Sequence, residues 1–176
     1  TAEFAGTHPP LTTNPHNPVH TPGGSSSGSA AAVAANMCTF ALGTQTGGSI
    51  LRPAAFCGVV GFKPTYGAYP ISGMLSAAHS FDTVGIFTRA ASDAREVHNA
   101  IMRQNNKKKP DIDSAAIGVW KGHLNANLSS EVDSAIDKVK HILAQYGHSV
   151  FSLDLPKEFG MLSQHRRIIN DFERYG

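Results

Sequence analysis

Two short glycine-serine turns are the part of this chain whose residue types could do chemistry: Gly23–Ser25 and Gly47–Ser49. Glycine lets the backbone adopt positive φ and approach a ligand closely, and serine supplies a hydroxyl that can act as a nucleophile. From Gly23 to Val60 the only Asp, Glu, Lys or Arg residue is Arg52, and a cation in such surroundings needs an anionic partner when it is buried. This combination indicates a reaction site that uses serine chemistry.

The first turn taken alone allows other interpretations. The segment Gly23–Gly28 contains only glycine and serine, a composition that is common in flexible linkers. It also fits the Gly-x-Ser-x-Gly pattern with Ser26 as nucleophile, but that pattern needs a preceding strand, which Pro15, Pro18 and Pro22 exclude. A phosphate-binding loop would need the lysine of a Walker motif, which is missing.

Composition narrows the class of protein. The 176 residues suffice for one sizeable core, and the net charge of +2 gives no strong attraction to nucleic acid or to an anionic membrane. No apolar run reaches the roughly 18 residues of a membrane-spanning helix. Cys38 and Cys57 lie among apolar residues, so we expect two buried free thiols and a reducing, cytoplasmic location. The histidines carry no Cys or carboxylate pattern typical of a metal site, so no metal is expected.

Hydrophobic patterning predicts an α/β protein. Proline-rich residues 5–28 should be irregular. The elements expected after them are a helix over 29–42, strands over 57–62 and 84–88, a helix over 92–104, a strand over 116–120, a helix over 129–147, a strand over 149–153 and a last helix from 159. The strand-helix-strand unit within 116–153 should pair its strands in parallel.

Three segments follow from this pattern. Residues 1–106 form the core that carries both serine turns, 107–113 is a polar connecting loop, and 114–176 continue the same domain. The basic run Lys107–Lys109 ends at Pro110 and is interpreted as part of a solvated loop.

Longer stretches of the chain resemble the amidase signature family. The match runs through 23–34, 41–50, 52–58, 61–67 and 82–85, with approach segments at 1–5 and 14–18. It is strong to about residue 95 and loose beyond. The resemblance implies a partial amidase-signature fold, with a mixed and largely parallel sheet layered between helices.

The same resemblance implies a Ser–cis-Ser–Lys hydrolase that needs no cofactor and no metal. Ser49 matches the nucleophile that attacks an amide carbonyl and becomes acylated. Ser25 matches the bridging serine, whose peptide bond to Gly24 is cis in the family. In this relay a neutral lysine accepts the proton of Ser25, and Ser25 accepts that of Ser49, which requires a lysine pKa depressed by its surroundings.

The resemblance also assigns supporting groups. The backbone N–H groups of Thr46, Gly47, Gly48 and Ser49 match an oxyanion hole, for which two adjacent glycines are suited. Ser26 matches a residue that supports this network by hydrogen bonding, although a simple loop or cap hydroxyl is an equal alternative.

Two positions depart from the commonest family pattern. Arginine is the third residue after the nucleophile, Arg52, where most members have it second, and position 45 is Gln where many have Asp. Both departures resemble a malonamidase-like branch in which this arginine binds a substrate carboxylate. A planar guanidinium pairs well with carboxylate. The alternative is that Arg52 is structural.

These observations lead us to expect an amidase that hydrolyses the C–N bond of a small linear amide, with no nucleic acid or membrane partner and with homo-oligomerisation left open. The first alternative is the glutamine-hydrolysing component, the A subunit, of a tRNA-dependent amidotransferase, which shares this signature. The second is a non-catalytic module that retains the fold.

The lysine base of the family has no counterpart before Ser25, since the first lysine of the sequence is Lys63, which lies in a turn separate from the family's base. We therefore expect this chain to be an internal piece of an amidase. The prediction is that the purified 176-residue chain hydrolyses a simple amide no faster than buffer. Ammonia release that Ser49→Ala abolishes would contradict it.

Overall fold

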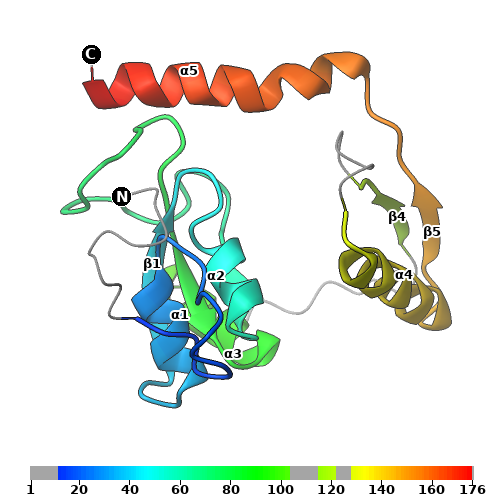
Figure 1. The fold of residues 1–176 in the computed structure, drawn as a ribbon, viewed down its shortest axis with the longest axis horizontal. Coiled ribbons are helices and arrows are strands. Elements are labelled where there is room, and N and C mark those ends of the chain that lie inside the picture. Colours follow the sequence, from blue (N-terminus) through cyan, green and yellow to red (C-terminus); the bar gives the residue numbers. More distant parts are fainter. Residues whose placement is uncertain (1–11, 104–114, 122–127, 176) are drawn as a thin grey trace. The chain divides into compact units, whose positions relative to one another are not determined.

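The computed structural model describes residues 12–103, 115–121 and 128–175 (Figure 1). Its elements in chain order are α1 (Ser27–Ala34), β1 (Phe40–Gln45), α2 (Leu51–Phe56), β2 (Val60–Phe62), β3 (Thr83–Thr88), α3 (Ala91–Ile101), β4 (Ala116–Val119), α4 (Ser130–Gln145), β5 (Ser149–Ser152), the 3₁₀ helix η2 (Lys157–Met161) and α5 (Leu162–Tyr175). The chain divides into two compact units, Thr1–Lys107 with Ile169–Gly176, and Lys108–Ile168. The predicted connecting loop, 107–113, lies outside the described residues.

The first unit is built on a three-stranded sheet in the order β1-β3-β2. Both pairings are antiparallel, and Ile86 of the central strand lies opposite Leu42 on one side and Phe62 on the other. β-Branched and aromatic residues make β3 a good buried strand. Parallel pairing is confined, among the described strands, to β4 and β5.

Helices cover the two faces of this sheet. Phe87 packs in one cluster with Val33 of α1, with Ala54 of α2 and with Ile50, the residue before α2. Its neighbour Ile86 points to the other face, since successive side chains of a strand alternate, and packs in a second cluster with Ala94 of α3. Helices therefore layer the sheet on both sides, and the predicted α/β class is confirmed.

The second unit contains the predicted strand-helix-strand element. β4 and β5 pair in parallel, with Ala116 opposite Ser149. The Ser129 hydroxyl caps α4 by accepting from the N–H of Val132 at 3.4 Å, and Gly147 ends the helix region with φ of 84°. These local signals are strong, and the sequence prediction of this unit is confirmed.

The predicted helix over 29–42 is wrong at its end. The helix stops at Ala34, Asn36 has φ of 59°, and the Arg89 guanidinium donates to the Cys38 carbonyl at 3.0 Å. Residues from Phe40 onward form β1 instead, because their backbone groups pair with β3. The short helix α2 was not predicted, since Pro53 lies within its six residues.

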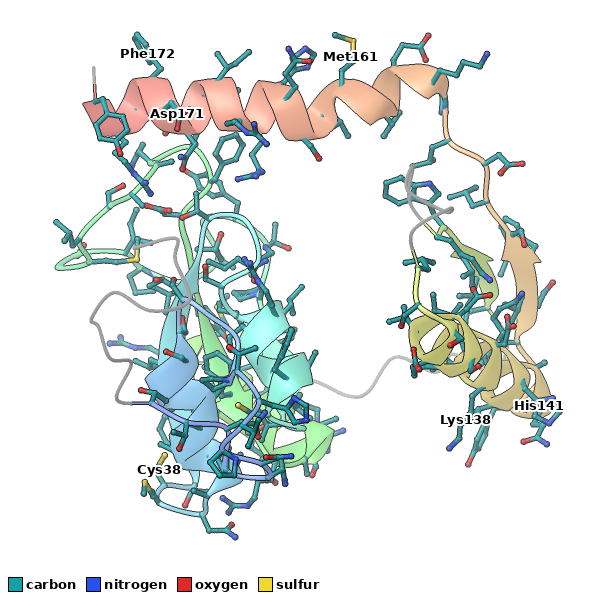
Figure 2. The ribbon with its side chains drawn as sticks, in the orientation of Figure 1. Cys38, Lys138, His141, Met161, Asp171 and Phe172 are labelled. Atoms are coloured by element: carbon teal, nitrogen blue, oxygen red, sulfur yellow. The ribbon has the colours of Figure 1, made fainter. Side chains whose placement is uncertain are left out.

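Both cysteines are free thiols, as predicted, but the prediction that both are buried is wrong for Cys38, which is partly exposed. Figure 2 shows Cys38 in the turn that follows α1. Cys57 is buried, its Sγ lies 3.4 Å from the Pro22 carbonyl oxygen, and burial raises the pKa of this thiol. Within the described ranges, no helix is long and apolar enough to cross a membrane.

Candidate active site

The two serine turns lie next to each other in the first unit. The first turn leads into α1, and the second follows the end of β1. The backbone N–H of Ser26 donates to the carbonyl of Ser49 at 3.2 Å. The Ser26 hydroxyl also donates to the Thr44 carbonyl and accepts from the Thr44 N–H, each at 3.2 Å. Backbone and side-chain groups of Ser26 thus tie the start of α1 to the end of β1.

A glycine in β1 permits this approach. A Cβ atom on Gly43 would lie 2.6 Å from Cε2 of Phe87 and 2.8 Å from Oγ of Ser26. Both distances are shorter than van der Waals contact allows, so any side chain here would push α1 away from the strand. Gly43 therefore helps to keep Ser26 against Thr44.

The first turn is compact and packs against α2. The peptide bond between Gly24 and Ser25 is cis, and Gly23 has φ of 73°. A Cβ atom on Gly23 would lie 2.9 Å from Cα of Pro53, so glycine is required both for the backbone angle and for the close packing. Ser25 is half-buried at this turn.

The side chain of Gln45, which in sequence is only a departure from the family pattern, closes the second turn. The side-chain oxygen of Gln45 accepts from the N–H groups of Ile50 at 2.9 Å and Leu51 at 3.0 Å. Gln45 thereby satisfies free donors at the start of α2 and draws residues 46–49 into a loop. Ser49 in this loop is 9% exposed.

A buried carboxylate holds the same loop from another side. Asp82 accepts hydrogen bonds from Oγ1 of Thr46 at 2.5 Å, Oγ of Ser76 at 2.8 Å, and the N–H groups of Ala77 at 2.6 Å and Ala78 at 2.9 Å. Burial acts to raise the pKa of Asp82, but these hydrogen bonds outweigh it and leave the pKa below its ordinary value. The sequence contained Asp82 within a matching motif but did not indicate this function.

Two basic residues take different positions. The guanidinium of Arg52 lies beside Gly48 in the loop that carries Ser49. A Cβ atom added to Gly48 would lie only 3.2 Å from Nη2 of Arg52. Lys63 donates from Nζ to the carbonyl oxygen of Pro64 at 2.5 Å. Arg52 is thus adjacent to the turn that carries Ser49.

The irregular segment before the first turn is anchored to the end of α2. Nδ2 of Asn14 donates to the carbonyls of Thr21 at 3.1 Å and Phe56 at 2.9 Å. His16 bonds through Nε2 to the Cys57 carbonyl at 2.9 Å. These contacts use carbonyls that a helix end leaves free. The start of α2 therefore lies beside the turn that carries Ser49. Its end binds the irregular segment that leads into the turn that carries Ser25.

Comparisons with known proteins show which families and proteins this chain is similar to. A sequence model of the family described as Amidase matches residues 4–170. The A subunit of glutamyl-tRNA(Gln) amidotransferase from Desulforapulum autotrophicum is 41% identical over 166 residues, which cover 83% of this chain and 34% of that protein.

Solved structures are also similar. The A subunit of glutamyl-tRNA(Gln) amidotransferase from Thermotoga maritima superposes with a TM-score of 0.83 at 30% identity, covering 98% of this chain and 42% of that one. Peptide amidase from Stenotrophomonas maltophilia superposes with a TM-score of 0.78 at 30% identity, covering 98% and 40%. The chain spans about a third to two fifths of the length of these proteins.

The Asp82 contacts predict how stability depends on pH. Because the pKa of Asp82 is lowered in the folded state, its contribution is present above the unfolded pKa of about 3.9 and is lost as pH falls through the folded pKa. Asp82→Asn should lower the free energy of unfolding by about 2 kcal/mol at pH 7. Thermal unfolding followed by circular dichroism should show this difference shrinking below about pH 4.

The matched control is Asp154→Asn, which changes an exposed carboxylate and should leave the unfolding temperature nearly unchanged. A difference between Asp82→Asn and the unsubstituted protein that stays constant from neutral to acid pH would show that the charge of Asp82 does not stabilise the fold.

Proposed function

The chain belongs to the amidase family, and we propose that it supplies the serine pair with which the protein hydrolyses an amide C–N bond through an acyl-enzyme. The observation that carries this proposal is the hydrogen bond from the Ser26 N–H to the Ser49 carbonyl at 3.2 Å, which makes the two serine turns neighbours. Ser49 is the proposed nucleophile and Ser25 the proposed bridging serine.

The proposed chemistry is the one that the resemblance to the amidase family implies. Oγ of Ser49 attacks the amide carbonyl carbon while its proton passes to Ser25 and on to the family's lysine base. The N–H groups of Thr46, Gly47 and Gly48 stabilise the negative oxygen that forms. The C–N bond then breaks, the protonated amine or ammonia leaves, and water hydrolyses the Ser49 ester. No cofactor is used in this sequence of steps.

We propose glutamine as the amide donor. In support, curated relatives such as that of Desulforapulum autotrophicum are named as the A subunit of glutamyl-tRNA(Gln) amidotransferase. Glutamine is a primary amide that also bears a carboxylate, and the guanidinium of Arg52 beside Gly48 is suited to bind one. In this function the protein works with partner subunits and a charged tRNA.

A second candidate is an amidase that acts without partners on another small amide bearing a carboxylate. Gln45 and the shifted Arg52 favour it, because both resemble the malonamidase-like branch. The similarity to a solved structure named as a peptide amidase supports an amidase function. The free cysteines are compatible with a cytoplasmic location in either case.

Assays of the complete gene product separate the two candidates. Ammonia release from glutamine that appears only with the partner subunits and tRNA supports the amidotransferase function. Ammonia release from a small acidic amide by the protein alone supports the amidase. Absence of both, together with no labelling of Ser49 by a fluorophosphonate, would favour a non-catalytic module.

Ser49→Ala in the complete gene product should abolish both hydrolysis and fluorophosphonate labelling, because the acyl-enzyme cannot form. Mass spectrometry of the labelled protein should place the adduct on Ser49. The matched control is Ser92→Ala. Ser92 lies on α3 and its hydroxyl donates to Asp93, so this variant should keep both hydrolysis and labelling. An adduct on another serine would refute this assignment.

Arg52→Lys should raise KM for an acidic amide by about tenfold or more, because a lysine cannot pair bidentately with carboxylate. KM for a neutral amide of similar size should change little. Steady-state kinetics with both substrates provide the comparison, and equal changes in the two KM values would mean that Arg52 is structural.

A further inference from the structure

The position of the Thr46 side chain constrains the loop that presents Ser49. Thr46 provides one of the proposed oxyanion donors through its N–H, and its hydroxyl is bound to the buried carboxylate of Asp82. Gln45, the residue before it, is 7% exposed and caps α2. With both residues held, the direction of the Thr46 N–H depends on where Asp82 lies.

Two sets of hydrogen bonds fix the segment that carries Asp82, residues 78–82. Within it, the N–H groups of Phe81 and Asp82 donate to the Ala78 carbonyl at 3.0 and 2.9 Å. At its surface, the N–H of Ser80 donates to Oε2 of Glu173 at 3.0 Å, and the Ser80 hydroxyl donates to Oε1 of the same carboxylate. Both oxygens of one α5 side chain therefore bind one residue of this segment.

Glu173 is well placed for this contact. The hydrogen bonds from Ser80 lower the pKa of Glu173, so the carboxylate that accepts them is ionised at neutral pH. Figure 2 shows the neighbouring Phe172 pointing away from this segment. Ser80, which Glu173 binds, lies two residues before Asp82 in the chain, and Asp82 in turn binds Thr46.

We propose that Asp82 is a positioning residue for the oxyanion loop, and that Glu173 of α5 fixes the segment from which Asp82 acts. This inference rests on the proposed function. Oxyanion donors accelerate a reaction only when they already point at the site where charge develops. Loosening Asp82 should therefore reduce kcat and leave KM nearly unchanged, since the Thr46 N–H acts in the transition state.

The test uses the complete gene product with its preferred amide. The enzyme concentration is set by titrating Ser49 with a fluorophosphonate, so that unfolded protein is not counted. Asp82→Asn, which cannot accept from all four donors, should lower kcat per titrated site by at least about tenfold. Thr46→Val should do the same, and the double variant should be little worse than either, because both remove one interaction.

Two conservative changes complete the experiment. Thr46→Ser keeps the hydroxyl donor and should lose less kcat than Thr46→Val. Glu173→Gln should lower kcat by about threefold, because a neutral amide accepts the two hydrogen bonds from Ser80 less well than a carboxylate. Glu158→Gln, at an exposed position of η2, is the matched control and should leave kcat unchanged.

The outcomes separate this inference from the function on which it rests. Hydrolysis that survives Ser49→Ala would overturn the proposed function itself. If Ser49→Ala is inactive but Asp82→Asn keeps its kcat per titrated site and loses only thermal stability, then Asp82 is merely structural. A Glu173→Gln variant indistinguishable from Glu158→Gln would remove α5 from the proposal.

Discussion

The structure of the site depends on the contact between the start of α1 and the end of β1. Ser26 makes this contact with its backbone N–H, which binds the Ser49 carbonyl, and with its hydroxyl, which binds both backbone groups of Thr44. Gly43 permits the approach because a Cβ atom there would collide with Ser26 and Phe87. Two turns distant in sequence therefore share one small region of the fold.

Several independent groups then define the loop that carries Ser49. Gln45 closes it toward α2, Asp82 holds Thr46, and Arg52 lies against Gly48. At the far end of α2, Asn14 bonds to the Phe56 carbonyl and holds the segment that leads into the first turn. A loop of this kind can keep its N–H groups directed at a substrate because its conformation is specified from several sides.

How much could be predicted from sequence differed between elements. The second unit was predicted well, since Ser129, Gly147 and the apolar spacing of α4 are local signals. β1 and α2 were missed. Phe40–Gln45 becomes a strand through pairing with β3, and α2 is a six-residue helix stabilised by Gln45. Local propensity cannot report a partner supplied by a distant segment.

The amino-acid sequence by itself determined the chemistry that this chain can offer: two serines in glycine turns, one arginine beside them, and motifs specific enough to identify the family. Only the tertiary structure decided which groups orient them. The roles of Gln45, Asn14 and Asp82 arise from hydrogen bonds between segments far apart in the chain. Such bonds depend on how the backbone folds back on itself, and local patterns of residue type and spacing do not show which distant segments will meet.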